Sequence, residues 1–256
     1  MFDREPHFHV LRFPVRVELW FVLIAVLFGL RRDYLPAAYI FEWMAVLFVA
    51  ILVHELGHAM AFRRFGQEPR VVLTGMGGLT YGSAPFRDRR QDIIVSLAGP
   101  IGEFIVLGLP FYLLHNAVDF DSRFLSVLVY DMYFVAFIWS LVNLAPVLPL
   151  DGGHVTQALF GRPAARRISV VAGLAVSIYL FQAGYDFGPF FFLILAGLSG
   201  VEIYFEYKSG GAPRVAVLPP SPGEWGGGYG GGDYGPPPSR AQRRKAPKPP
   251  KPLSPR

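Results

Sequence analysis

Two histidines with a glutamate between them form the segment His54-Glu55-Leu56-Gly57-His58. Side chains four residues apart lie on the same face of an α-helix, one turn above the other. The two imidazoles can therefore bind one metal ion together, and Glu55 can take a proton from a water molecule that this metal holds. The pattern predicts a metal site that performs hydrolysis.

Such a site needs a further ligand, because catalytic zinc usually has three protein ligands and one position open for water. The chain contains no cysteine, so the third ligand must be His, Asp or Glu, and a disulfide framework is excluded. Asp151 stands out because Pro146, Pro149 and the pair Gly152-Gly153 break the helix around it. Broken backbone is costly in lipid unless it lines a cavity. Asp151 is the expected third ligand, and Glu202 and Glu206 are the alternatives.

The composition places these residues in a membrane protein. Of 256 residues, 52% are hydrophobic and 17% are charged, whereas an ordinary soluble domain has roughly 25% charged residues. Residues 209–256 hold 8 of the 24 basic and 2 of the 19 acidic side chains, which leaves 16 basic and 17 acidic groups before them. The composition excludes a soluble enzyme and argues against a nucleic-acid-binding domain.

Six apolar runs reach or approach the roughly 20 residues that a membrane-spanning helix needs. They are Phe13–Leu30, Leu35–Phe62, Ile93–Leu114, Phe124–Leu148, Ile168–Ala183 and Phe187–Phe205. With six spans, loops on the side of the N-terminus hold twelve arginines and loops on the other side hold three. The positive-inside rule then places both termini in the cytoplasm. We expect a multi-pass protein of a bacterial-type inner or cell membrane.

The sequence predicts that the two motifs meet at one depth. The second and fourth runs both point toward the cytoplasm, and the second ends near Arg63. At 1.5 Å per residue, His54 and His58 lie about 13 and 7 Å below that boundary. Asp151 lies just beyond the fourth run, at a similar level.

A small β element is expected in the loop between the second and third runs. Short β-prone segments flank the glycine-rich turn Gly75–Gly78, which is typical of a hairpin. The segment Phe8–Val17 also favours a strand. The predicted fold is thus an all-α polytopic membrane protein of about six helices, with a membrane-associated β-hairpin.

These motifs resemble those of the site-2 protease family of intramembrane zinc metalloproteases, whose pattern is HExxH in one core span and NxxPxxPLDG in another. Both are complete here, and the resemblance covers about residues 8–207. It implies that His54, His58 and Asp151 bind one Zn²⁺ and that Glu55 is the general base and acid. It also implies that Asn143 helps to hold the substrate or the developing oxyanion.

The resemblance extends to two further segments. Gly75, Gly77 and Gly78 look like part of the family's β element, which would receive an extended substrate by strand addition. The stretch Ser96–Pro100 matches another family segment, but Glu103 stands where that segment more often has Asn. The expected substrate is a single-span membrane protein in the bilayer.

The chain divides into a protease-like domain, residues 1–207, and a tail, residues 208–256. The tail is rich in Gly and Pro and basic at its end, a composition that does not fold alone. A solvated, disordered cytoplasmic tether is expected, with binding to anionic lipid headgroups or a proline-rich docking motif as alternatives.

The function predicted from these residues is cleavage of a peptide bond in or near a membrane-spanning segment by a zinc endopeptidase. The alternative is a non-enzymatic membrane protein, either a metal transporter or a protease-like scaffold. Glu55 favours the enzyme, since a transporter needs ligands but has no use for a general base beside them.

Overall fold

A computed structural model of the chain describes residues 5–30, 36–75, 77–83, 88–184 and 188–208. Within these residues, five helical stretches are long and apolar enough to cross a membrane. They are Ala38–Arg64, Arg89–Ala117, Arg123–Asn143, Arg162–Gln182 and Gly188–Phe205. They coincide with five of the six predicted spans, and the tail lies outside the described residues.

The first predicted span differs from the structure. Its opening residues form strand β2 (Phe13–Val17), and helix α1 (Leu19–Leu30) has 12 residues. At 1.5 Å per residue α1 is about 18 Å long, whereas a bilayer core is about 30 Å thick. The segment Phe13–Leu30 is therefore not one continuous helix, and a total of six spans stays a prediction.

A four-stranded sheet extends the predicted hairpin. Strand β1 (Phe8–Val10) pairs antiparallel with β2, β2 pairs parallel with β3 (Arg70–Thr74), and β3 pairs antiparallel with β4 (Gly77–Tyr81). The strand order is β1-β2-β3-β4, so β4 is an end strand. The fold is mostly helical, as predicted, but its sheet recruits the N-terminal segment as well as the hairpin.

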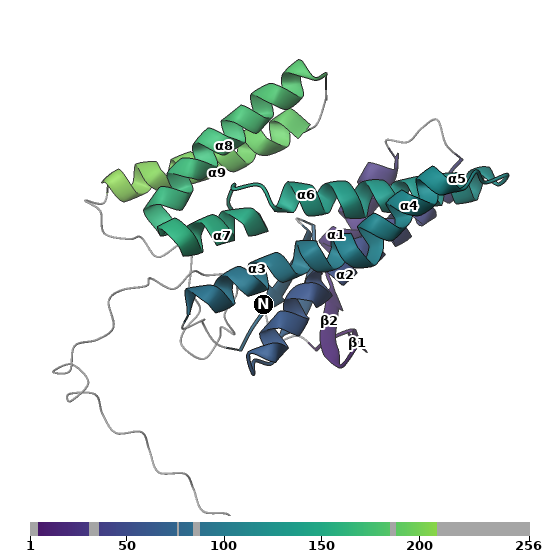
Figure 1. Cartoon of the computed structure of the whole chain (residues 1–256), viewed down its shortest axis with the longest axis horizontal. Helices are drawn as coiled ribbons and strands as arrows, with labels where there is room; N and C mark the ends of the chain where they lie inside the picture. The colour runs from purple at the N-terminus through teal and green to yellow at the C-terminus, as the bar shows by residue number, and fades with distance from the viewer. Residues whose placement is uncertain (1–4, 31–35, 76, 84–87, 185–187, 209–256) are drawn as a thin grey trace, which may run out of the picture.

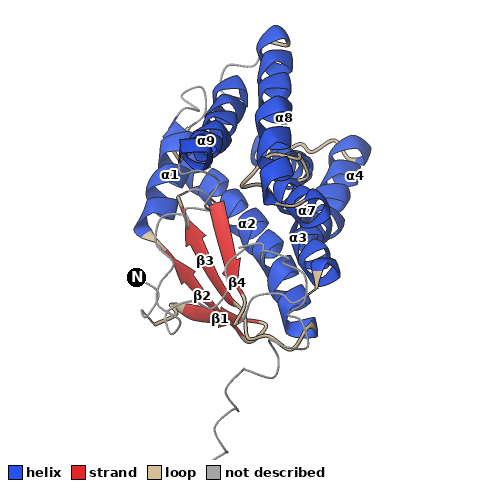
Figure 2. Cartoon of the chain, turned by 90° about the vertical axis from the view of Figure 1, so that its left-hand side faces the viewer, coloured by secondary structure: helices blue, strands red, loops and turns tan. Residues whose placement is uncertain are grey.

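The sheet packs on the helix that carries both histidines. Alternate residues of a strand point to one face, and Phe13, Val15, Val71 and Leu73 are buried on the same face of the sheet. They form one core cluster with Phe21 of α1 and with Leu56 and Ala59 of α2 (Ala38–Arg64). Figure 2 shows the sheet lying beside these two helices. This packing holds β4 against the middle of α2.

Each of the next two spans is interrupted by a π-helical turn. The first consists of α3 (Arg89–Glu103), a π turn η1 (Phe104–Gly108) and α4 (Leu109–Ala117). The second consists of α5 (Arg123–Tyr133), a π turn η2 (Phe134–Ile138) and α6 (Trp139–Asn143). The two turns pack on each other, since a Cβ added at Gly108 would lie 3.1 Å from the Cα of Phe137.

The two halves of these spans have different partners. Beyond the π turns, α4 and α5 pack through aromatic rings, with Tyr112 and Tyr133 5.4 Å apart and His115 stacked on Tyr133 at 5.6 Å. Before η1 and after η2, α3 and α6 carry Glu103 and Ser140, both fully buried. The turns thus separate an aromatic half from a polar half.

The remaining helices form a second layer (Figure 1). Helix α7 (Asp151–Phe160) follows the proline-containing loop, and α8 (Arg162–Gln182) lies side by side with α9 (Gly188–Lys208). Val147 and Leu150 of the loop join the core between α8 and α9. Large apolar side chains such as Val171, Phe181 and Val201 are exposed, as expected for helices that face lipid.

Candidate metal centre

The middle of α2 places three polar side chains in the protein interior. His54, Glu55 and His58 are 5%, 4% and 1% exposed, on a helix whose remaining buried residues are largely apolar. Ionisable groups within a membrane span are costly and mark functional sites. The spacing of four residues stacks the two imidazoles, whose ring centres lie 4.8 Å apart.

Asp151 reaches the same place from the opposite side. It is the first residue of α7, where the chain turns back after Leu144–Leu150. The turn is tight, because a Cβ at Gly152 would collide with the carbonyl of Leu144. The hydroxyl of Ser169 on α8 also accepts a hydrogen bond from the Leu148 amide at 2.9 Å. Both contacts fix the direction in which Asp151 enters the site.

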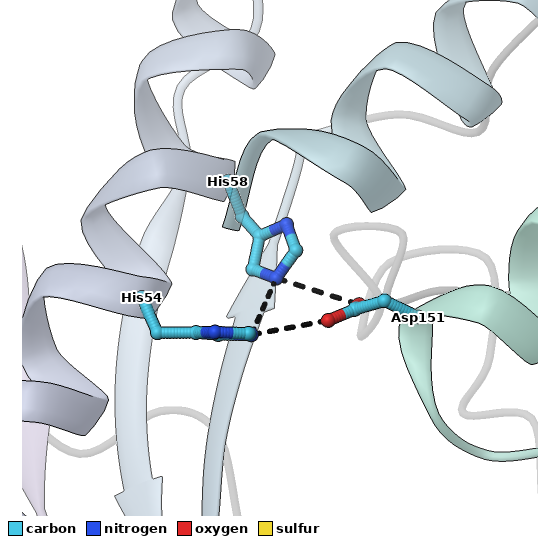
Figure 3. A group of neighbouring side chains, drawn as sticks. All are labelled: His54, His58 and Asp151. Atoms are coloured by element: carbon cyan, nitrogen blue, oxygen red, sulfur yellow. Dashed lines mark hydrogen bonds and ion pairs between the residues drawn. The ribbon is translucent and has the colours of Figure 1, made fainter. Parts of the chain in front are cut away.

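Three side-chain atoms converge with the spacing of metal ligands (Figure 3). The Nε2 atoms of His54 and His58 are 3.1 Å apart, and Asp151 oxygens lie 3.1 Å from the first and 3.4 Å from the second. Tetrahedral ligands at zinc–ligand distances of 2.0 to 2.2 Å lie about 3.3 to 3.6 Å from one another. The 3.1 Å contact to Asp151 is made by Oδ2 and the 3.4 Å contact by Oδ1, so the two Nε2 atoms and the carboxylate lie close enough together to bind one ion.

The hydrogen bonds of the other ring nitrogens support this assignment. His58 Nδ1 lies 2.7 Å from the carbonyl oxygen of Val95, which can only accept, so Nδ1 carries the proton. His54 Nδ1 lies 2.9 Å from a carboxyl oxygen of Glu103, and it donates to this oxygen when Glu103 is ionised. In neutral rings this leaves both Nε2 lone pairs facing the Asp151 carboxylate. Such a set of donors fits a cation.

Glu55 is held beside the ligands by strand β4. The hydroxyl of Thr80 lies 2.7 Å from Glu55 Oε2 and 3.1 Å from the Glu55 backbone oxygen. Gly78 lies directly against the Glu55 side chain, because an added Cβ would overlap its Cγ, Cδ and Oε1 atoms. The hairpin thus positions the carboxylate that the sequence singles out as the general base.

The Gly78→Ala substitution tests this close approach. The new methyl group would push the Glu55 carboxylate away from its position, while His54, His58 and Asp151 keep their places. We expect cleavage of a membrane-protein substrate to fall about 10- to 100-fold, because small displacements of catalytic groups have effects of this size. Zinc content should stay at the wild-type level, as measured by atomic absorption on the purified chain.

Gly200→Ala is a matched control, since a Cβ at Gly200 meets nothing within 4 Å. Its activity should equal that of wild type. Full activity in Gly78→Ala would show that the contact between β4 and Glu55 has no role in catalysis.

The other predicted hairpin glycines have different surroundings. A Cβ at Gly75 would lie 3.2 Å from Cβ of Trp20 on α1, and Gly77 has a φ of +116°, which favours glycine. The structure therefore gives Gly75 a packing role and Gly77 a conformational role. Substrate binding by Gly75, Gly77 and Gly78 stays a prediction.

Asn143 ends α6 and is 7% exposed. Its side-chain amide donates to the Trp139 carbonyl at 3.2 Å. Its amide oxygen is left for another partner, but the contact with substrate or oxyanion stays a prediction.

The alternative ligands lie elsewhere. Glu202 forms an ion pair with Arg166, whose Nε lies 2.7 Å from Glu202 Oε2, and this pair joins α8 to α9. The Glu206 side chain lies outside the described residues. His154 is one turn from Asp151 but does not belong to the ligand group found among the described residues. Burial lowers the pKa of His154 to about 4, so its ring is neutral at neutral pH.

Sequence reasoning left three neighbours of the site without a role. Thr80 lies within the predicted hairpin, but nothing in a strand sequence shows which hydroxyl meets a helix 25 residues earlier. Ser140 and Glu103 lie 2.9 Å apart, with Glu103 in turn bonded to His54. The unusual carboxylate at position 103, inside an apolar span, was the one signal available for these contacts.

The chain is similar to two curated proteins and to one solved structure. No model of a known protein family matches the chain. It is 24% identical over 160 residues to a zinc metalloprotease of Methanocaldococcus jannaschii, an alignment that covers 60% of this chain and 45% of the relative. It is 28% identical over 158 residues to stage IV sporulation protein FB of Bacillus subtilis, covering 60% and 49%. The chain thus spans about half the length of these curated relatives.

The fold has a solved counterpart. The structure of a site-2 protease from Methanocaldococcus jannaschii superposes with a TM-score of 0.53 at 19% identity, covering 84% of this chain and 97% of that chain. At this identity the likeness shows the fold. Taken with the two sequence relatives and the geometry of His54, His58 and Asp151, it supports the resemblance of this chain to the site-2 protease family.

Proposed function

We propose that the chain is a zinc-dependent intramembrane endopeptidase that hydrolyses a peptide bond in or near a membrane-spanning segment. The observation that carries the proposal is the joint arrangement of three ligand atoms and Glu55. His54, His58 and Asp151 bring one possible ligand atom each to within 4.8 Å of the others, and Thr80 holds the carboxylate of Glu55, the residue next to His54. The three candidate metal ligands and the candidate base are thus buried in the same site.

The residues divide the chemistry between them. His54, His58 and Asp151 would hold the zinc, which would act as a Lewis acid and make water a better nucleophile at neutral pH. Glu55 takes the proton of the attacking water at a carboxylate oxygen and delivers it to the leaving amine nitrogen. Thr80 donates to Glu55 Oε2 and so keeps the carboxylate turned toward the reaction. Asn143 would bind the substrate carbonyl or the oxyanion.

The sheet supports a role in substrate binding. A peptide bond in a helix is shielded by its own hydrogen bonds, so a membrane-spanning substrate must unwind before it is cut. An end strand can pair with such an extended segment, and β4 is the end strand that contacts Glu55. Strand addition to β4 would therefore bring the extended substrate next to the base.

A non-enzymatic metal-binding protein is the second candidate. The ligand group alone suits a transporter or scaffold equally well. The contacts of Thr80 and Gly78 with Glu55 favour the enzyme, because they position a carboxylate that takes no part in the ligand group.

Removal of the metal tests the proposal. The full chain is purified in detergent and mixed with a single-span membrane protein, with and without prior treatment with a zinc chelator. We expect cleavage to disappear on chelation and to return when one equivalent of Zn²⁺ per chain is restored. Cleavage that persists in the chelated protein, with zinc shown to be absent, would contradict the proposal.

Both cytoplasmic termini and a location in the cell membrane are part of the proposal, which therefore includes a sixth crossing before Ala38. The five described spans support an integral multi-pass protein, and the distribution of arginines over six spans supports the orientation. Contact of the tail with anionic lipid headgroups stays a prediction, since residues 209–256 lie outside the described part of the chain.

A further inference from the structure

Glu103 is a buried carboxylate for which the proposed reaction has no step. It is 0% exposed and lies at the end of α3. Burial of a charge costs a great deal of free energy unless the charge is paired or hydrogen-bonded. Its position inside a membrane span therefore calls for a function.

Two groups lie at hydrogen-bond distance from one oxygen of Glu103. His54 Nδ1 lies 2.9 Å from Oε2, and the Ser140 hydroxyl lies 2.9 Å from the same atom and 2.6 Å from the Ala136 carbonyl, so its single proton is shared between these two acceptors. An ionised carboxylate oxygen can accept both hydrogen bonds. The other oxygen, Oε1, is buried and has no hydrogen-bond partner among the described residues. The hydrogen-bond contacts of Glu103 are thus made with the ring of His54 and with the hydroxyl of Ser140.

The contact decides which nitrogen of His54 is available. With the Nδ1 proton donated to Glu103, the Nε2 lone pair points at Asp151 and His58, 3.1 Å from each. His58 has the same tautomer, because its Nδ1 proton is donated to the backbone carbonyl of Val95. The two ligands are therefore oriented differently, one by a neutral carbonyl and one by a carboxylate that adds a negative charge.

Glu103 and Ser140 both lie next to a π-helical turn. Glu103 is the last residue before the π turn η1, and Ser140 is the second residue after the π turn η2. π turns inside α-helices are frequent at functional sites because they change which face a helix presents. Here the two turns pack on each other, and the residues that flank them meet at His54.

We propose that Glu103, supported by Ser140, is a positioning residue that fixes the orientation and tautomer of the zinc ligand His54 and strengthens zinc binding with its charge. The inference rests on the proposed zinc site. Partners of this kind typically contribute 10- to 100-fold to metal affinity or activity. Glu103 acts through His54 and does not need to touch the substrate.

Zinc affinity of the Glu103→Gln variant tests the inference. The dissociation constant is measured on the full chain in detergent by competition with a chromogenic zinc chelator. We expect Zn²⁺ to bind about 10- to 100-fold more weakly than to wild type, since the amide keeps the size of the side chain but loses the charge. Glu42→Gln is the matched control, because Glu42 is buried on the same helix as His54 but 12 residues away. Its affinity should stay within twofold of wild type.

A second measurement separates positioning from a general structural role. The thermal unfolding midpoint of the zinc-free protein should be no lower in Glu103→Gln than in wild type, because the substitution removes a buried charge. A lower midpoint together with unchanged zinc affinity of the folded fraction would identify Glu103 as merely structural. A zinc affinity within threefold of wild type would overturn the inference.

Ser140→Ala provides a test that leaves the carboxylate in place. Loss of one hydrogen bond to Glu103 should weaken zinc binding about two- to tenfold. Ser177→Ala is its control, since Ser177 is buried and donates to the Pro189 carbonyl between α8 and α9. If Glu103→Gln does not fold, unchanged zinc affinity in Ser140→Ala counts against the inference.

These measurements do not require proteolysis. A chain that binds zinc in the expected order of affinities but cuts no substrate would refute the proposed function and leave the role of Glu103 intact. A chain that cuts its substrate, with zinc affinity insensitive to Glu103 and Ser140, would do the reverse.

Discussion

Substitution of Glu55 by Gln should reduce the rate of substrate cleavage about 10³-fold and leave zinc bound. Gln has nearly the same shape as Glu and keeps an oxygen near Thr80, but it cannot accept the proton of the attacking water. General bases typically contribute 10²- to 10⁴-fold to a rate. The measurement is the initial rate of cleavage of a single-span substrate by purified protein, with the zinc content of the same sample determined in parallel.

The control for this experiment is another buried carboxylate. Asp131 on α5 is 2% exposed, and the Asp131→Asn variant should keep the wild-type rate. If Glu55→Gln cuts as fast as wild type, the chain is not a protease of the kind proposed.

The Asp151→Ala substitution should abolish both zinc binding and cleavage. It removes the carboxylate from the group of candidate ligands and leaves the two imidazoles, whose Nε2 atoms are 3.1 Å apart. Because loss of a group that merely supports a ligand costs 10- to 100-fold in affinity, loss of the ligand itself should exceed about 100-fold. The chelator competition described for Glu103 measures this effect directly.

Glu202→Gln serves as the comparison, because Glu202 was the alternative third ligand and instead pairs with Arg166. It should bind zinc as tightly as wild type. Normal affinity in Asp151→Ala with a loss in Glu202→Gln would reverse the assignment of the third ligand.

The proximity of His54, His58 and Asp151 was predictable because each motif carries its own geometric information. The spacing of His54 and His58 determines their shared face on any helix, and the prolines around Asp151 mark an interruption in an apolar run. The orientation of the two spans then places both motifs at one depth. The structure brings the three residues together, as predicted.

Contacts between distant segments could not be predicted in this way. The segment Phe8–Val17 has strand character, but its parallel pairing with β3 depends on helices α1 and α2 that return the chain to the sheet. Likewise Thr80 meets Glu55 only because the sheet packs on α2. No local pattern encodes either contact, since both arise from tertiary packing.

The paired π turns also bear on how the protein can diverge in evolution. Because each turn shifts the phase of its helix at the same depth, the aromatic contacts of Tyr112, His115 and Tyr133 are set separately from those of Glu103 and Ser140. Substitutions in the aromatic half can thus accumulate, for instance as lineages adapt to bilayers of different lipid composition, without moving the carboxylate that supports His54.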